Sequence, residues 1–252
     1  MSSRPHIGIR LVGFLVVTLL AASCGKNDSH SERALNVEEA SILAEVLWRN
    51  YENGGAHFRL SAQAGIESGT ITLDGKIDWT QHHGQAQVFG GAQPNPVEEV
   101  WWDDSAVAEW RPDLTDELSG LVTSGMRPIV VRGPDTEHRR LDQLLAVVTG
   151  LAAESPENSQ LILQTEGSAF IRSDVLRGQQ VVLLRYGQRT IYWIDKQSGE
   201  MMRFEGINST GQYPVIVDIL DRGSQVIEFP ANAESIELAS NPDLSHFIPT
   251  SP

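Results

Sequence analysis

Short segments in which apolar and polar residues alternate make up most of this chain, and this pattern constrains the fold more than any other feature. From Ala56 to Ala64, apolar residues occupy every second position. This period is typical of a β-strand with one buried face. Similar runs separated by turn residues predict further antiparallel strands over 71–79, 85–89, 97–102, 105–110, 168–176, 180–186, 190–195, 201–206, 215–220 and 225–229.

Three segments have the periodicity of helices instead. Asn36 is a suitable N-cap for a helix that runs to Tyr51 and ends before Gly54. Two more helices are expected in the middle of the chain, over 113–122 and 139–153. The order predicts an α+β fold, in which a curved antiparallel sheet, or half-barrel, has helices covering its concave face. A ligand is expected in the space between these two layers.

The N-terminus has the features of an export signal. Arg4 and Arg10 precede an apolar stretch over 11–20, which is too short for a permanent span of about 20 apolar residues, and small residues lead to Cys24. The segment resembles the bacterial lipobox, although Ala21 stands where that pattern commonly has leucine. We therefore expect Cys24 to be lipidated. The alternative is an ordinary secretory signal, cut near Ala22, which leaves a free cysteine.

This interpretation divides the chain into four parts. Residues 1–23 are expected to be a signal peptide, and 24–35 a lipidated, flexible tether. The folded domain is expected over 36–232 and a C-terminal tail over 233–252. The protein would be held on the extracytoplasmic face of the cell membrane through its lipid.

Charge and cysteine content exclude several classes of partner. Loss of residues 1–23 removes two of the 19 basic residues and none of the 33 acidic ones, so the net charge becomes 17 − 33 = −16. This acidity argues against binding of nucleic acid and against a surface that lies flat on anionic lipid. Because Cys24 is the only cysteine, the domain has no internal disulfide and depends on burial of apolar surface.

Motifs for catalysis are weak. His82-His83 lies in an expected turn, and neighbours on a strand point to opposite faces, which does not suit a shared metal. Glu137-His138 lacks zinc-protease spacing, and the sequence has no Gly-x-Ser-x-Gly or phosphate-binding loop. Glu98-Glu99 and Asp103-Asp104 are residue types used in glycoside hydrolysis or calcium binding, but their adjacency favours a strand and a turn. We expect no catalysis, metal or cofactor.

Tryptophans gather in the first half of the expected sheet, where they are either core residues or the wall of a ligand cavity. Trp101 and Trp102 are neighbours on one strand, so they must face opposite sides of the sheet. The residues expected to line the cavity come from these strands and from the helix over 139–153; they are Phe58, Leu60, Ile71, Leu73, Trp79, Trp101, Leu144, Leu145 and Val148.

The segment 190–205, with the sequence TIYWIDKQSGEMMRFE, resembles the strand, acidic turn and strand unit of the LolA/LolB-like lipoprotein carriers and their actinobacterial LppX/LprG-type relatives. The layout of signal, opening helix, early strands, central helices and later hairpins is also similar, over about 36–230. The resemblance implies a half-barrel closed by helices, and binding or transfer of lipids or lipoproteins without catalysis. The proline-rich loop 93–96 and the strong acidity depart from that family.

The sequence therefore predicts a membrane-anchored bacterial lipoprotein that binds or carries lipid, acyl chains or another apolar ligand at the cell envelope. The alternative is an interaction module that binds a protein partner and has a closed core. The helix over 139–153 distinguishes the two. An apolar face wider than the sheet can cover indicates an open groove, whereas complete interdigitation indicates a closed core.

Overall fold

The computed structural model describes residues 32–63, 69–91, 93–207, 214–241 and 243–244. The predicted signal peptide and Cys24 lie outside the described residues. Within them, twelve strands form one sheet in the order β12-β6-β5-β4-β3-β2-β1-β11-β10-β9-β8-β7. All neighbouring pairs are antiparallel except β6 and β12, which are parallel.

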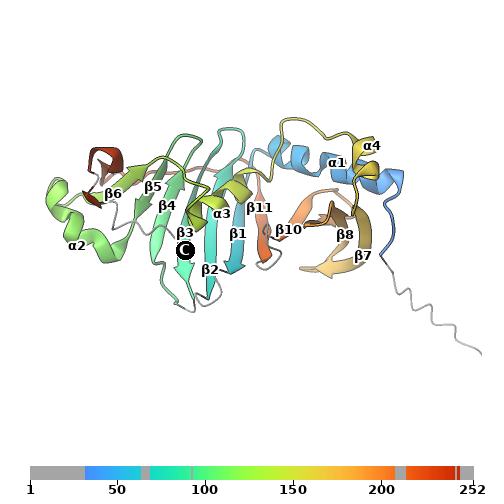
Figure 1. The fold of residues 1–252 in the computed structure, drawn as a ribbon, viewed down its shortest axis with the longest axis horizontal. Helices are drawn as coiled ribbons and strands as arrows, with labels where there is room; N and C mark the ends of the chain where they lie inside the picture. The colour runs from blue at the N-terminus through green and yellow to red at the C-terminus, as the bar shows by residue number, and fades with distance from the viewer. Residues whose placement is uncertain (1–31, 64–68, 92, 208–213, 242, 245–252) are drawn as a thin grey trace, which may run out of the picture.

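The strands are β1 (Gly55–Gln63), β2 (Thr70–Asp78), β3 (His83–Gly90), β4 (Glu98–Trp102), β5 (Val107–Trp110), β6 (Arg127–Arg132), β7 (Ala169–Leu176), β8 (Gln179–Tyr186), β9 (Thr190–Asp195), β10 (Met201–Ile207), β11 (Pro214–Arg222) and β12 (Ala233–Glu237). The helices are α1 (Val37–Glu52), α2 (Thr115–Leu118), α3 (Arg140–Thr149) and α4 (Ser159–Gln164). Figure 1 shows α1 and α4 near one end of the long sheet and α2 near the other.

The predicted α+β class is confirmed, because a large, curved and mostly antiparallel sheet carries a few helices. The opening helix begins at the predicted N-cap. The Asn36 side chain accepts a hydrogen bond from the backbone N–H of Glu39 at 2.8 Å, and the Glu39 carboxylate accepts one from the Asn36 N–H at 3.0 Å. This reciprocal capping box satisfies two backbone groups that a helix start leaves open.

We call the helix side of the sheet the inner face. There, α1 packs over β8 and β10 and on α4, while α3 lies over β2 and β4. The inner residues of nearly all the strands and the apolar sides of α1, α3 and α4 belong to one continuous apolar core. The two helices therefore cover different parts of the same face, and the alternation seen in the sequence is explained by burial of every second residue against them.

Several predicted elements differ from those observed. The helix over 113–122 is broken into the single turn of α2 flanked by two short 3₁₀ turns, beginning at Pro112 and Ser119. The helix over 139–153 ends at Thr149, where Gly150 follows. Strand β6 and helix α4 were not predicted, and residues 233–237 of the expected tail form β12 beside β6. Short elements such as these owe their structure to neighbours distant in sequence, which local periodicity does not report.

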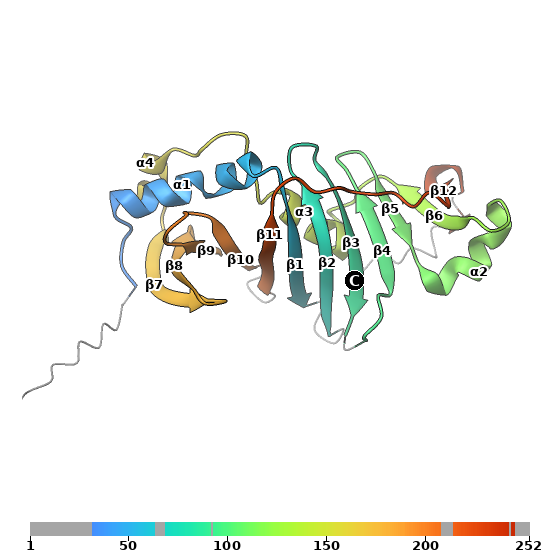
Figure 2. The same ribbon diagram turned by 180° about the vertical axis from the view of Figure 1, so that it is seen from behind.

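The predicted strand over 225–229 is instead an extended segment that does not pair in the sheet. We call residues 223–232 the strap and the side of the sheet opposite the helices the outer face. Seen from behind, the strap leaves β11 and crosses the back of the neighbouring strands to reach β12 (Figure 2). Because it runs across the strands, its backbone cannot join their ladder, although Val226, Ile227 and Phe229 are residue types favoured in strands.

Both edges of the sheet are protected against addition of another strand. At β7, Phe170 exchanges two backbone hydrogen bonds with Arg33, and the Val175 N–H donates to the Asp174 carboxylate at 2.8 Å. The other edge strand, β12, has only five residues and carries exposed Glu237. Short, charged or capped edges of this kind prevent pairing between chains.

Candidate functional site

Seven of the nine residues expected to line an apolar cavity are buried in the closed core. Phe58, Leu60, Leu73, Leu144 and Val148 have exposed fractions of 0 %, and Trp79 and Leu145 have 2 % and 3 %. At 0 % no water-sized sphere touches a side chain, so these residues do not border a space that holds even one water molecule. The structure brings the predicted set together on the inner face, as a packed core.

Polar anchors hold α3 and the following chain on this core. The indole N–H of Trp79 donates to the Val148 carbonyl at 3.0 Å, and that of Trp102 donates to the Thr149 hydroxyl at 3.1 Å. The buried amide of Asn50, in α1, donates to the Leu151 carbonyl at 2.6 Å. Buried donors left without partners are costly, so these bonds fix the helices at the distance that the packed side chains require.

The remaining two candidates occupy different positions. Ile71 is partly buried at the edge of the core. Trp101 lies on the outer face, and Trp102 takes the inner position, where it meets Phe58 edge to face at 6.4 Å. The sequence predicted opposite faces for the two tryptophans but placed the wrong one among the inner residues, because adjacency in a strand does not say which neighbour faces inward.

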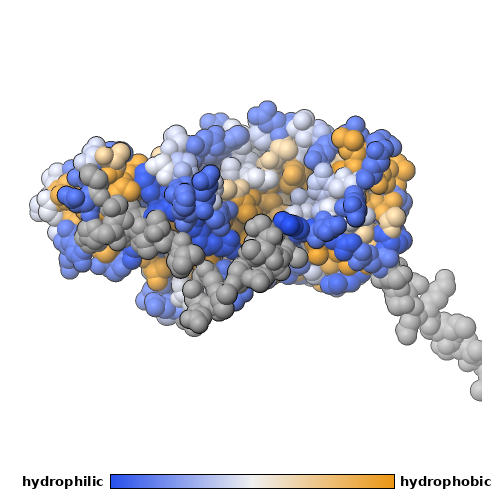
Figure 3. Space-filling view, viewed as in Figure 1, coloured by the Kyte–Doolittle hydropathy of each residue, from blue (hydrophilic) through white to orange (hydrophobic). Residues whose placement is uncertain are grey.

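Figure 3 shows the inner side of the molecule with its helices. Hydrophilic residues cover much of this surface, and apolar residues are visible in a recess near its middle. The residues described above as fully buried lie beneath this surface.

A polar depression on the outer face is the candidate site that sequence reasoning missed. We call it the outer trough. It has a volume of about 280 Å³ and lies over β1 to β4 against the strap. Its polar and aromatic lining side chains are His57, Asp74, Lys76, Gln85, Gln87, Glu99, Trp101 and Glu228. The outward members of the alternating strands supply seven of these eight residues.

The strap is fastened to the sheet beside this trough. The backbone N–H of Glu228 donates to the Gln85 side-chain oxygen at 2.9 Å, and the Trp101 indole N–H donates to the Glu228 carbonyl at 2.9 Å. The ring of Phe229 meets that of Trp101 edge to face at 5.5 Å. These contacts fix the wall of the trough, and no local signal in the sequence relates residues 85 and 101 to residue 228.

Ion pairs neutralise two of the carboxylates in the trough. Asp74 contacts His57 at 2.6 Å and Arg59 at 2.5 Å, and Glu99 contacts Arg127 at 2.8 Å. Burial acts to raise the pKa of Asp74, but hydrogen bonds from His57 and Arg59 outweigh it and hold this pKa below its ordinary value. Asp74 is therefore ionised at neutral pH, and both carboxylates have a cationic partner.

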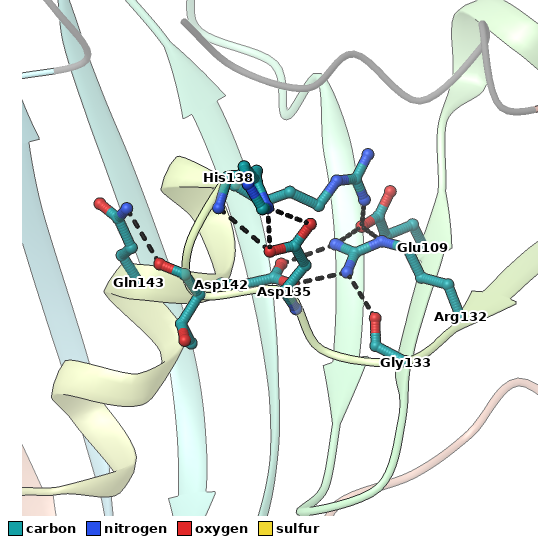
Figure 4. A network of polar contacts seen from close by, with 9 residues as sticks. Glu109, Arg132, Gly133, Asp135, His138, Asp142 and Gln143 are labelled. Atoms are coloured by element: carbon teal, nitrogen blue, oxygen red, sulfur yellow. Dashed lines mark hydrogen bonds and ion pairs between the residues drawn. The ribbon is translucent and has the colours of Figure 1, made fainter.

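A second polar cluster lies on the inner face and is buried (Figure 4). The guanidinium of Arg132, in β6, contacts Glu109 in β5 with its Nε at 2.8 Å and Asp142 in α3 at 2.6 Å. All three side chains are at most 6 % exposed. Asp142 also accepts the backbone N–H of Asp135 at 2.6 Å. The cluster attaches the start of α3 to the sheet, which is a structural role.

Glu98 lies at the margin of this cluster. Its Oε1 is buried and has no hydrogen-bond partner among the described residues. Burial, followed by the negative charge of Glu109, raises the pKa of Glu98 to about 8. The folded protein therefore holds this side chain in its neutral form at pH 7.

Substitution Glu98→Gln should stabilise the protein above neutral pH. A carboxyl whose pKa is raised in the folded state contributes stability at low pH that is lost as pH rises from the unfolded value towards 8. The variant has no such loss, so we expect its free energy of unfolding to exceed that of the parent by about 3–5 kcal/mol at pH 8.5 and to match it near pH 4.5. Urea unfolding at both pH values tests this, and a constant difference would contradict it.

The two acidic pairs singled out in the sequence lie on a strand and in a turn. Glu98 faces inward and Glu99 outward, as adjacency predicted, and the Asp103 carboxylate accepts the N–H groups of Ser105 and Ala106 in a turn. No group of three or more histidine, cysteine or acidic side chains in the described ranges is placed to hold a metal. Among the helices that the structure describes, none has the length and apolar character needed to span a membrane.

The hairpin that carried the family resemblance is formed by β9 and β10 as predicted. In its turn, the Asp195 carboxylate accepts the backbone N–H groups of Gln197 and Ser198, both at 2.8 Å. Asp195 thus has the ordinary role of an aspartate in a turn.

No protein-family model matches the sequence, and no curated protein matches it. Solved structures with similar folds include LprF from Mycobacterium bovis, at 14% identity and a TM-score of 0.49, covering 80% of this chain and 100% of that one. The Mycobacterium tuberculosis lipoprotein LppX is 11% identical, with a TM-score of 0.41 and coverage of 76% and 95%.

A third similar structure is MucB in its complex with MucA, at 11% identity and a TM-score of 0.35, covering 80% of this chain and 62% of that one. LppX, the type of lipoprotein to which the sequence resemblance pointed, is thus among the structures similar to this chain. At these TM-scores the likeness concerns the order of strands and helices, and no activity follows from it.

Proposed function

We propose that this protein is a lipid-anchored module on the extracytoplasmic face of the cell membrane that binds a protein partner, without catalysis. The observation that carries this proposal is the closed core, in which five of the residues expected to bind an apolar ligand have exposed fractions of 0 %. An acyl chain needs a preformed apolar space, and these residues do not supply one. The lipid on Cys24 would hold the module at the membrane.

The outer face is the surface that we assign to the partner. Two of the exposed large apolar residues, Val226 at 68 % and Phe229 at 47 %, lie on the strap, and the ring of Phe229 meets the partly buried Trp101. Aromatic residues surrounded by a polar rim are typical centres of protein interfaces. The net charge of −14 for the whole chain favours a partner with a basic surface and fast, salt-dependent association.

The protected edges limit how this partner can bind. The contacts of Arg33 and Asp174 at β7 disfavour strand addition at part of this edge. We therefore assign the contacts to side chains on the outer face.

Photo-crosslinking in intact cells tests the proposal. A photoreactive amino acid at Val226 should yield one dominant protein adduct, whose amount falls at higher salt because screening weakens attraction between charged surfaces. The matched control is the same group at Leu161, which is 61 % exposed but lies in α4 on the helix side. Equal adducts at both positions, or none at Val226, would contradict the proposed surface.

The carrier function remains a second candidate, because one specific feature favours it. Apolar residues are visible in the recess on the inner side (Figure 3). A ligand there would contact the surface of the core rather than its fully buried residues.

A further inference from the structure

We propose that the outer trough is a binding site for a neutral saccharide unit. The trough adjoins the strap surface assigned to a protein partner and shares Trp101 with it, but the two assignments are tested by separate experiments. Its volume of about 280 Å³ lies at the lower limit for small-molecule pockets, which span about 300–1,000 Å³. This size suits one sugar ring or two rather than an acyl chain or a larger cofactor.

The electrostatics of the trough favour a neutral ligand. Asp74 and Glu99 are already paired with Arg59 and Arg127, at 2.5 and 2.8 Å. These arginines do not line the trough, so each neutralises a carboxylate from outside. Lys76 and Glu228 add one charge of each sign, and the described residues offer neither of them an ion pair within 4 Å. A strongly charged ligand would meet as much repulsion as attraction.

Hydrogen-bonding groups in the trough match hydroxyl groups, each of which donates one hydrogen bond and accepts others. Gln85 accepts the Glu228 N–H with its side-chain oxygen, which leaves its NH₂ group able to donate. Gln87 is exposed and offers both an NH₂ group and an oxygen. The Lys76 ammonium donates, and carboxylate oxygens of Asp74 and Glu99 have lone pairs beyond those used in their ion pairs. The depression therefore offers both donors and acceptors, as a polyhydroxyl compound requires.

Trp101 supplies the apolar element of the site. Its N–H is bound to the Glu228 carbonyl and its ring is held by Phe229, so the indole is fixed before a ligand arrives. A rigid aromatic wall costs little entropy on binding, and its electron-rich face attracts the C–H groups on one side of a sugar ring. The strap thus fixes one wall of a site on the solvent-facing side of the strands. The binding groups of this site are amides, carboxylates and an indole ring.

An NMR titration tests the assignment. The exported chain with Cys24→Ser, which carries no lipid, is titrated with glucose, galactose, mannose, N-acetylglucosamine, N-acetylgalactosamine and ribose. Trp101→Phe identifies the indole N–H signal of Trp101. At least one sugar should shift this signal saturably with a Kd of about 1–10 mM, typical of weak single-unit binding. Because the ligand is neutral, this Kd should not change between low and high salt.

Matched variants separate the trough from the rest of the surface. Gln87→Leu should weaken binding by about tenfold, as loss of one good hydrogen bond implies. Gln180→Leu is the control, since Gln180 is also an exposed glutamine on a strand but lies on β8, outside the trough. The proposal is overturned if no sugar shifts the Trp101 signal, if Gln87→Leu leaves the Kd unchanged, or if salt abolishes binding, which would indicate a charged ligand. None of these outcomes alters the crosslinking expected at Val226.

Discussion

Substitution Arg132→Met should lower the free energy of unfolding by about 3–5 kcal/mol, the range found when one partner of a buried ion pair is removed. The Arg132 guanidinium contacts both Glu109 and Asp142, whose side chains are 5 % and 1 % exposed. Without the guanidinium, buried Asp142 would lose this ion pair, and Glu109 would keep the longer contact with Arg139 at 3.4 Å. Urea unfolding at pH 7 measures the loss.

The matched control is Arg172→Met. Arg172 pairs with Asp174 at 3.0 Å, but its side chain is 49 % exposed. An exposed pair contributes less than about 1 kcal/mol, so this variant should unfold almost as the parent does. Similar losses in the two variants would show that burial of the Arg132 cluster has no special effect.

Substitution Leu144→Ala should cost about 2–5 kcal/mol, because it removes packed methyl groups and leaves a void in the core. Leu144 is fully buried in the inner layer, where α3 faces the sheet. If a ligand cavity bordered this residue, the alanine would only enlarge an existing space. The loss of stability would then be limited to the free energy of burying the removed methyl groups, which is at most about 1.5–3 kcal/mol.

Leu161→Ala provides the reference for this comparison. Leu161 is 61 % exposed on α4, and substitutions at such positions change stability by about 0.5 kcal/mol or less. Both variants are compared by urea unfolding under the same conditions. A change at Leu144 no larger than that at Leu161 would contradict a closed inner face.

Much of the fold follows from local sequence. The capping box at Asn36 and Glu39, and the alternation along β1, contain enough information to place α1 and the first strand. The strap also contains residue types favoured in strands, yet it crosses the sheet, and residues 233–237 pair beside β6 instead. Pairing between distant segments decides such cases, and a single sequence does not report it.

The site was less predictable than the fold. Sequence periodicity gathered Phe58, Leu60 and Leu144 on one face correctly, but it does not distinguish a filled layer from an empty one. That distinction depends on how side chains from α3 and the sheet interdigitate. The outer trough depends on contacts of Glu228 with Gln85 and Trp101, which are more than a hundred residues away in the sequence. From the sequence alone, its polar residues have the pattern of an ordinary solvent-exposed strand face.

Native mass spectrometry tests the central claim, a closed core in a protein without an apolar ligand, most directly. The exported chain with Cys24→Ser is mixed with a membrane lipid extract, repurified and weighed under conditions that keep it folded. The closed core predicts the mass of the protein alone. A bound species of lipid mass that disappears in a folded variant with a bulky, charged residue at Leu60 or Leu145 would contradict the claim and establish the carrier function instead.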